Sequence, residues 1–421
     1  MRSRLEDIAN FQKGFAFKSK DFIQSGVRIV KVTNLTDESI DLSSCVHIDE
    51  NLAKSYGQYS LQYEDIIITT VGSWPTNPAS VVGKVVKVPK DGNNSLLNQN
   101  AVRVRNNGKA NQKYLYYLLR SEAFKEYIIG TAQGSANQAS ITQKDIKNFT
   151  YEIPQIKIQD SIAYILSTLD EKIEVNNQIN KTLEAMAQAL FKHWFIDFEF
   201  PNEDGEPYKS SGGEMVESEL GMIPKGWGLS ILNKIVDFVK ASTKPGEHLK
   251  DRKYIPIDAM PMKSVTINDY KSYEEAKSSL LLFEKFDILI GAMRVYFHRV
   301  NLAPFKGVTR TTTFVLRSKR KDDIAYNLFL LNLNETIDYA EKISKGTTMP
   351  YAIWENGLGE LMIVHPQESI RREFGKAVFP MLERMIYLAE ENTKLQEIRD
   401  TLLPKLMSGE IRVLLDQEGE I

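Results

Sequence analysis

Apolar residues recur at alternating steps of three and four along two long stretches of the chain. The first stretch is marked by Ile162, Leu166, Leu169, Ile173, Asn176, Asn180, Leu183, Ala187, Leu190 and Trp194. The second is marked by Phe374, Val378, Met381, Met385, Leu388, Asn392, Leu395, Arg399, Leu402 and Leu406. This alternation is the seam of a coiled coil. It predicts two long helices, over residues 156–200 and 367–411, that pack on each other.

Both seams carry an asparagine at the same place in the repeat, Asn180 and Asn392. A buried seam asparagine usually fixes the register and orientation of the partner helix, at some cost in stability. Two prolines qualify the second helix, because Pro404 predicts a kink or break near its end and Pro380 fits only a start or a bend. Since a globular block separates the two stretches, we expect the helices to be antiparallel.

The chain repeats itself once, and the offset between the two copies shrinks from 227 residues near the start to 212 residues from Pro154 onward. A shrinking offset is typical of a second copy with shorter loops. The matching positions are Leu5, Ile8, Phe11 and Lys13 with Leu232, Ile235, Phe238 and Lys240, residues 65–68 with 287–290, Gly134 with Gly346, and Pro154 with Pro366. The repeat predicts two domains of similar topology.

The block at the start of each copy has a mixed pattern. Short runs rich in Ile and Val predict strands, and residues 114–127 and 326–343 predict helices. The fold class is therefore α+β, with two similar mixed α/β domains, residues 1–155 and 220–366, separated by the pair of long antiparallel coiled-coil helices. Residues 201–219 are predicted to be a polar linker and residues 412–421 a tail.

Composition narrows the class of protein. The chain has 421 residues, of which 42% are hydrophobic and 26% charged, as is ordinary for a globular protein of two or three domains. The sequence has no apolar run long enough for a membrane helix and no apolar signal core behind Met1. A single cysteine, Cys45, excludes a disulfide framework and a Cys-cluster zinc site. We therefore expect a cytoplasmic protein without a membrane partner.

The net charge of −2 hides an uneven distribution. Residues 1–155 carry +4 and residues 220–366 carry +5, whereas the segments between and after them are acidic. This pattern suits two modules that face a polyanion, joined by parts that face something else. Random scatter of charge is the alternative, because both values are small.

Catalytic signatures are missing from the sequence. It contains no dinucleotide-binding or Walker phosphate loop, no His-Glu-x-x-His, no nucleophile elbow and no Asn/Asp-Pro-Pro-Phe/Tyr methyltransferase motif. Asp258 with Glu275 and Lys277 resembles the carboxylate and lysine set of a metal-dependent nuclease, but such short patterns recur by chance. We predict no catalytic residue, metal site or cofactor on this chain.

Polar and aromatic residues gather in two loops of each block, and lysines lie near its start. Asn and Gln can pair with adenine, Arg with guanine, and Lys with the sugar-phosphate chain. The candidate DNA-binding residues are Lys13, Lys18, Lys20, Ser73, Trp74, Asn77, Gln133, Ser135, Asn137 and Gln138 in the first block and Lys240, Lys244, Arg294, Tyr296, Lys345, Thr347 and Thr348 in the second. Each residue alone is also compatible with a solvated loop. As sets, two similar scaffolds with different loops would read two different targets.

These features together resemble the specificity subunit of type I restriction–modification systems, over nearly the whole chain. The most specific stretches are Ala189 to Phe198 (ALFKHWFIDF) and Leu402 to Ile411 (LLPKLMSGEI), which are similar to the ends of the two spacer helices of that family. Leu5 to Phe17, Ile231 to Lys240 and Gly130 to Ile141 are similar to its target-recognition domains.

The resemblance implies a recognition subunit that is not itself an enzyme. Each globular block would read one half of a bipartite site on double-stranded DNA, and the helices would set the spacer between the halves. Two modification subunits would dock on the helices and supply adenosylmethionine and the adenine-methylating site. Restriction subunits would bring ATP- and Mg-dependent translocation and cutting. The alternatives are a self-contained nuclease or methyltransferase, and a coiled-coil scaffold without DNA contact.

Overall fold

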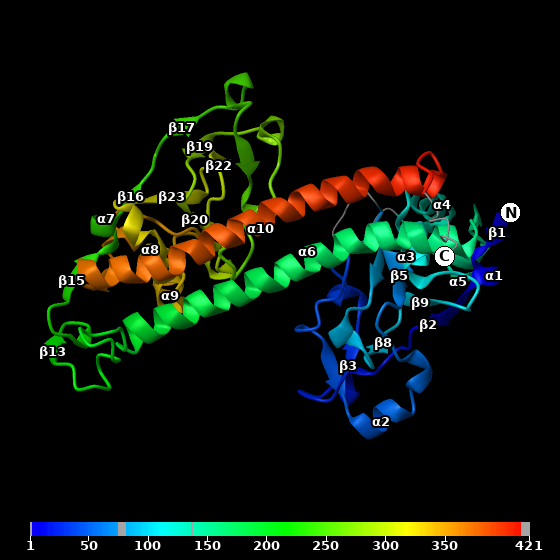
Figure 1. Ribbon diagram of the computed structural model, residues 1–421, viewed down its shortest axis with the longest axis horizontal. Coiled ribbons are helices and arrows are strands. Elements are labelled where there is room, and N and C mark those ends of the chain that lie inside the picture. The colour runs from blue at the N-terminus through cyan, green and yellow to red at the C-terminus, as the bar shows by residue number, and fades with distance from the viewer. Residues whose placement is uncertain (1, 75–80, 136–137, 414–421) are drawn as a thin grey trace, which may run out of the picture. The chain divides into compact units, whose positions relative to one another are not determined.

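The computed structural model describes residues 2–74, 81–135 and 138–413 (Figure 1). The chain divides into two compact units, which we call unit 1 (residues 1–171 and 396–421) and unit 2 (residues 172–395). Two long helices, α6 (Ile156–Phe191) and α10 (Glu368–Ser408), contribute a segment to each unit. Most of the predicted C-terminal tail lies outside the described residues.

Unit 1 contains a four-stranded antiparallel sheet in the order β2-β9-β5-β7. Its strands are β2 (Ala9–Lys13), β9 (Ala101–Asn106), β5 (Ile66–Thr69) and β7 (Val85–Lys87). Beside it lie a β1–β12 pair (Arg2–Arg4 and Thr150–Glu152) and the sheet β4-β3-β8 (Val46–Ile48, Val27–Val30 and Leu96–Leu97). The helices are α1 (Leu5–Ile8), α2 (Glu50–Lys54), α3 (Gln112–Arg120), α4 (Glu122–Thr131) and α5 (Gln143–Asn148).

Unit 2 has a corresponding antiparallel sheet in the order β16-β23-β20-β21. Its strands are β16 (Val236–Phe238), β23 (Thr313–Ser318), β20 (Ile288–Gly291) and β21 (Val300–Leu302). A pair β15–β24 (Gly228–Ile231 and Met362–His365) and the sheet β17-β19-β22-β18 (Ser242–Thr243, Leu280–Phe283, Gly307–Arg310 and Lys253–Ile255) complete the strands. Its shorter helices are α7 (Leu232–Ile235), α8 (Ile324–Leu331) and α9 (Asn334–Lys342).

The two units share this topology, which confirms the repeat seen in the sequence. An isolated pair joins the start of each block to its end, and a short helix leads into the four-stranded sheet. Two helices, α3 and α4 or α8 and α9, follow the strand of that sheet that comes last in the chain. The short helices α1 and α7 hold the matched residues Leu5 and Leu232, which are buried. The repeated apolar residues are therefore the core positions of one scaffold used twice.

An ion pair between a buried aspartate and a partly exposed arginine is also repeated. Asp65 accepts two hydrogen bonds from Arg105, at 2.6 and 2.7 Å, and Asp287 accepts two from Arg317, at 2.8 and 2.7 Å. Both aspartates are 2% exposed, so their charges depend on the bidentate arginine and on one backbone N–H each. The pair ties the second and third strands of the sheet together in each unit.

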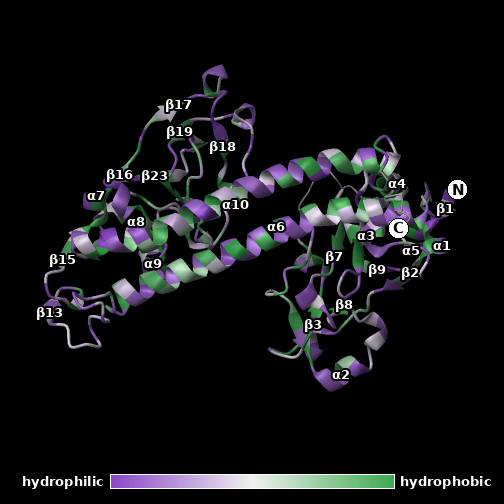
Figure 2. Ribbon diagram, in the orientation of Figure 1, coloured by the Kyte–Doolittle hydropathy of each residue, from purple (hydrophilic) through white to green (hydrophobic). Residues whose placement is uncertain are grey.

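The two helices pack through one stripe of residues in each unit, and both alternate between hydrophobic and hydrophilic residues along their length (Figure 2). In unit 2 the stripe contains buried asparagines: Asn176 donates to Asn392 Oδ1 at 2.8 Å and Asn180 donates to the carbonyl oxygen of Met385 at 3.2 Å. The predicted seam residues Ile173, Asn180, Met385 and Asn392 are buried, and Leu169, Leu183, Leu190, Met381, Leu395 and Leu402 are half-buried.

The α10 helix continues through both prolines, so the expected break at Pro404 is wrong and Pro380 requires no helix start. Both proline rings lie on the exposed side of the helix. There water can bond the carbonyl group that each proline leaves without an N–H partner. Packing of the opposite, buried side then holds the helix together.

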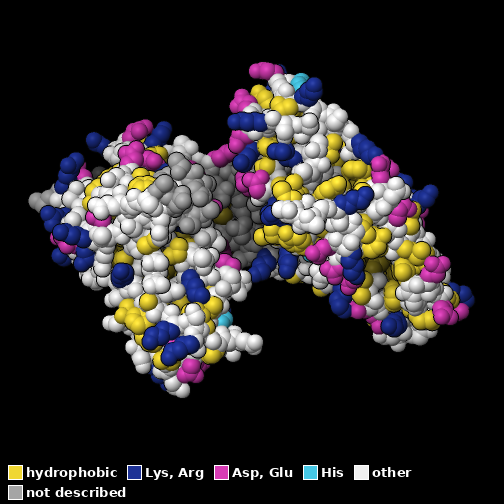
Figure 3. Space-filling model, turned by 180° about the vertical axis from the view of Figure 1, so that it is seen from behind, with side chains coloured by type: hydrophobic (Ala, Val, Ile, Leu, Met, Phe, Trp, Pro, Cys, Tyr) yellow, Lys and Arg dark blue, Asp and Glu magenta, His cyan; other side chains and the backbone are white. Residues whose placement is uncertain are grey.

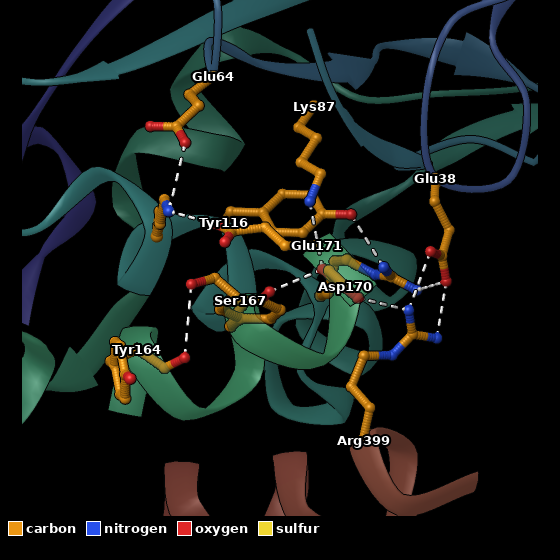
Figure 4. A network of polar contacts seen from close by, with 12 residues as sticks. Glu38, Glu64, Lys87, Tyr116, Tyr164, Ser167, Asp170, Glu171 and Arg399 are labelled. Carbon is orange, nitrogen blue, oxygen red and sulfur yellow. Dashed lines mark hydrogen bonds and ion pairs between the residues drawn. The ribbon is translucent and has the colours of Figure 1, made fainter. Parts of the chain in front are cut away.

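A buried charge cluster lies at the seam in unit 1, beside the apolar seam residues Ile162, Leu166 and Leu406 (Figure 4). Arg399, which occupies a predicted seam position, donates to Asp170 Oδ1 at 2.8 Å and to Glu38 Oε2 at 2.9 Å. Tyr117 donates its hydroxyl to Asp170 at 2.6 Å, and Arg120 donates to Glu38 at 2.9 Å. Arg399 and Asp170 are almost fully buried, so this cluster joins both helices to the globular part of unit 1.

The segment predicted as a linker is structured. The Tyr208 ring stacks on Phe200 with centroids 4.6 Å apart, and Phe200 stacks on Trp227 at 5.0 Å. Residues 215–218 form β13 (Met215–Ser218), which pairs with β14 (Gly221–Pro224). A few aromatic contacts between distant positions thus order a stretch whose composition is polar. The α-helical part of the first long helix ends at Phe191, and a π-helical turn, Lys192–Ile196, follows it.

Replacement of Arg399 by Met should lower the free energy of unfolding of unit 1 by about 3–5 kcal/mol, because it leaves Asp170 buried with Lys87 as its nearby cation. Urea denaturation of the full chain measures the change. Arg372→Met, the same substitution at an exposed position of α10, is the control and should stay within about 0.5 kcal/mol of the wild type. A loss below about 1 kcal/mol for Arg399→Met would show that the cluster does not hold the seam.

The same cluster predicts a dependence on pH. Burial alone would raise the pKa of Asp170 and Glu38, but the positive charges and hydrogen bonds of their arginine and lysine neighbours lower both pKa values. A lowered pKa contributes stability above the unfolded value, and this stability is lost as the pH falls through the folded value. The difference in melting temperature between wild type and Arg399→Met should therefore be largest near neutral pH and narrow below about pH 4. A difference that is constant down to pH 3 would contradict the assignment.

Candidate nucleic-acid interface

The two candidate loops of unit 1 meet on one small sheet. Residues 71–72 (β6) pair with β11 (Gln138–Ser140), which pairs with β10 (Gln133–Ser135). Gly134 is required here, because a Cβ atom at this position would lie 2.0 Å from the carbonyl oxygen of Gln138. Segments that are 61 residues apart in the sequence, at Trp74 and Ser135, thus form one surface.

The side chains on this surface differ in what they can offer. Trp74 donates its ring N–H to the carbonyl oxygen of Ser135 at 2.8 Å and packs on the core of unit 1, so it joins the two loops. Gln133, Ser135 and Gln138 are exposed beside it. Ser73 adjoins Trp74 and is half-buried. Asn77 and Asn137, also predicted to contact DNA, lie outside the described residues.

The lysines predicted to hold phosphate in unit 1 lie on other elements. Lys13 ends β2, and Lys18 and Lys20 flank or occupy the 3-10 turn Ser19–Asp21. All three side chains are exposed. They are accessible cations on elements other than the three strands of the loop sheet.

The corresponding loops of unit 2 also come together. Met293 and Lys345 both form β-bridges with Tyr351, and the backbone N–H of Arg294 donates to the carbonyl oxygen of Pro350 at 2.7 Å. Arg294 adopts a left-handed backbone, with φ of 49°, and its side chain is half-buried. Tyr296, Lys345, Thr347 and Thr348 are exposed around it. Both units therefore join the same two loops, with different residues on them.

Charge is less available in unit 2 than the sequence indicated. Lys240 forms an ion pair with Glu355 and lies 5.4 Å from the centre of the Phe238 ring, so a phosphate group would have to compete with Glu355 for it. Lys244 is exposed after β17. Basic and acidic side chains are interspersed over the face drawn in Figure 3. Recognition through the loops would accordingly depend on a few placed groups more than on a broad basic surface.

Apolar residues at this surface were not selected as candidates from the sequence. Met293, Met349 and Tyr351 lie on the joined loops of unit 2 and line a cavity of about 370 Å³. The signal for them was an apolar trio, Met349-Pro350-Tyr351, directly after the polar run that ends at Thr348. Sequence reasoning favoured side chains that carry hydrogen bonds and passed over these.

The described residues also bear on the other chemistry that was considered. Asp258 and Glu275 lie on separate 3-10 turns, Ile257–Ala259 and Tyr273–Glu275, and not at the end of a strand. Within the described ranges, no group of three or more His, Cys, Asp or Glu residues is placed to hold a metal ion. No helix of this part of the chain is long and apolar enough to cross a membrane.

Comparison with known proteins gives a consistent result. Residues 1–185 match the type I restriction modification DNA specificity domain. The MjaIX type I restriction enzyme specificity subunit of Methanocaldococcus jannaschii is 30% identical, and the match covers 72% of this chain and 69% of that protein. The HindI type I restriction enzyme specificity subunit of Haemophilus influenzae is 26% identical, with 71% and 77% covered. The crystal structure of a type I restriction–modification S subunit from M. genitalium shares the fold, with a TM-score of 0.56 at 15% identity over 97% of this chain and 96% of that one.

Replacement of Arg294 by Ala should reduce discrimination at one part of a DNA target by about 1–3 kcal/mol, the usual effect of losing a bidentate base contact. Competition binding with duplexes that carry single base-pair changes measures it. Lys319→Ala, an exposed position remote in sequence from both loops, is the control. Equal loss on all duplexes would assign Arg294 to the DNA backbone.

Proposed function

The chain belongs to the specificity subunits of type I restriction–modification systems, and on this premise we propose that each of its two units reads one half of a divided site on double-stranded DNA. It is the DNA sequence-specificity subunit of its complex and is not itself the enzyme. The comparisons give no support to a self-contained nuclease or methyltransferase, or to a scaffold without DNA contact. The division of the DNA site between the two units goes beyond the family assignment and is our proposal.

The observation that carries it is the repeated loop pair on a repeated scaffold. The β6–β11 pairing in unit 1 and the Met293–Tyr351 bridge in unit 2 occupy corresponding places after β5 and β20. Gly134 in β10 and Gly346 in the loop before Met349 lie at matching positions of the repeat, both with positive φ. The side chains around them differ: Gln133, Ser135 and Gln138 in one unit, Arg294, Lys345 and Thr347 in the other. To read two different half-sites, the two units need the same backbone scaffold with different side chains on its loops.

The helices supply a surface of another kind. In unit 2, three apolar residues of α6, Val175, Ile179 and Met186, are exposed at helical spacing. Tyr387 of α10 is also exposed. In unit 1, Tyr164 of α6 is 73% exposed and Ile398 of α10 is 48% exposed. Exposed apolar side chains in rows favour protein partners. This supports the proposal that two modification subunits dock on the helices, with restriction subunits joining the assembly.

Chemistry in this scheme belongs to those partners. Adenosylmethionine would bind the modification subunits, and ATP and Mg the restriction subunits, while this chain would hold none of them. We place the assembly in the cytoplasm, where the sequence predicts the protein and where its DNA target lies.

Mapping of methylated adenines in cells that carry this gene and its modification partner tests the proposal. The expected result is a bipartite motif with an unread spacer. Insertion of four residues into both helices, after Glu171 in α6 and after Leu395 in α10, lengthens each by about 6 Å and should change the spacer by about one or two base pairs. The same insertion after the exposed Gly212 is the control and should leave the motif unchanged. Methylation of the original motif by a complex that contains the helix variant would contradict the role of the helices in spacing.

A further inference from the structure

Unit 2 contains an apolar cavity where its two candidate DNA loops meet. Its volume is about 370 Å³. The floor is formed by the buried residues Ala292, Phe314, Ala352 and Trp354, and the rim by exposed or half-buried side chains, among them Thr312, Met349 and Tyr351. The aromatic rings of the floor contact one another, with the centroids of Phe314 and Trp354 5.8 Å apart. Trp354 is held in place because its ring N–H donates to Asn233 Oδ1 at 2.7 Å.

The rim exposes apolar groups that the fold itself does not cover. Met349 is 52% exposed and Tyr351 is 51% exposed, on a loop whose preceding residues are polar. Glu355, the charged side chain among the lining residues, already forms an ion pair with Lys240. The cavity therefore offers apolar contact and little that would pair with a charged ligand.

The surroundings of the cavity select DNA as its occupant. Met293 of the lining adjoins Arg294, and Met349 follows Thr347 and Thr348, so the cavity opens within the surface proposed to read one half-site. Two exposed basic residues lie close in sequence to the lining: Arg310 ends β22, directly before Thr311 and Thr312, and Lys345 lies four residues before Met349. Positive side chains near an apolar cavity favour binding of a polyanion, such as DNA, that presents an apolar group to the cavity.

Thymine is the base that presents such a group in the major groove, because its C5 carbon carries a methyl group. We infer that this cavity receives the 5-methyl group of a thymine and makes unit 2 select T·A over other pairs at one position of its half-site. The inference rests on the proposed function and names a contact within it. Floor residues Phe314 and Trp354 supply the apolar contact, and the joined loops place it at the DNA surface.

The test compares thymine with uracil, which differs only by that methyl group. The affinity of the wild-type chain, assembled with its modification subunits, is measured for a series of duplexes that carry the mapped site. In each duplex a different thymine of the site is replaced by uracil. Removal of one buried methyl group should weaken binding about four-fold at a thymine of a single half-site. Thr312→Trp, which places an indole ring at the rim and obstructs the cavity, should weaken binding to the unaltered site and abolish the further effect of that uracil. The near-isosteric Thr312→Val should retain the uracil effect.

Several results would overturn the inference. The first is equal affinity for thymine and uracil at every position, and the second is a uracil effect that persists unchanged in Thr312→Trp. The third is a Thr312→Trp variant whose defect is loss of subunit assembly, because that result would assign the cavity to a protein partner. Unstacking of the base, detected by 2-aminopurine fluorescence at the neighbouring position, would also overturn it, because a methyl contact leaves the base paired. Failure of the proposed function is distinguishable, since sequence-specific binding itself would then be absent.

Discussion

Each unit completes its core with segments of both long helices, and the rest of the structure depends on this packing. Ile162 and Leu166 of α6 lie in the same cluster as Leu406 and Met407 of α10 in unit 1, while Phe374, Val378 and Met385 of α10 join the core of unit 2. These segments are more than two hundred residues apart in the chain. Neither globular block therefore buries its apolar face with its own sequence alone, and α6 and α10 are part of the fold of both units.

Polar groups at the seam determine the register in which the two helices pack. A seam of apolar residues alone would allow the helices to slide by one heptad, whereas Asn176, Asn180 and Asn392 form hydrogen bonds in one register only. Arg399, Asp170 and Glu38 do the same in unit 1 with charge. Burying these ions costs hydration free energy, which the mutual hydrogen bonds offset. Under the proposed function the helices set a distance, and for that role a single register matters more than maximal stability.

Comparison of the two copies separates the features that the scaffold needs from the loop side chains that can vary. Three features recur in both units because each is needed to form the frame: the Asp65–Arg105 and Asp287–Arg317 ion pairs, the strand order of the four-stranded sheet, and the matched glycines Gly134 and Gly346. The loop side chains do not recur. Trp74 bonds across its loops with a ring N–H, while Met293 and Arg294 use backbone bridges at the corresponding place. The fold therefore tolerates change at the residues that would contact DNA.

The sequence by itself determined the long helices, the repeat and the α+β class, since these follow from periodicity and from matching core residues, which are local properties of the chain. It also located the loops, through their polar composition. Tertiary structure decided the rest. The helix runs through Pro404 because packing on one side outweighs a missing hydrogen bond on the other. The polar stretch after Phe200 is ordered because Tyr208 and Trp227 meet that ring. The cavity beneath Met293 and Tyr351 exists because segments about sixty residues apart lie side by side, and no local pattern encodes which distant side chains will meet.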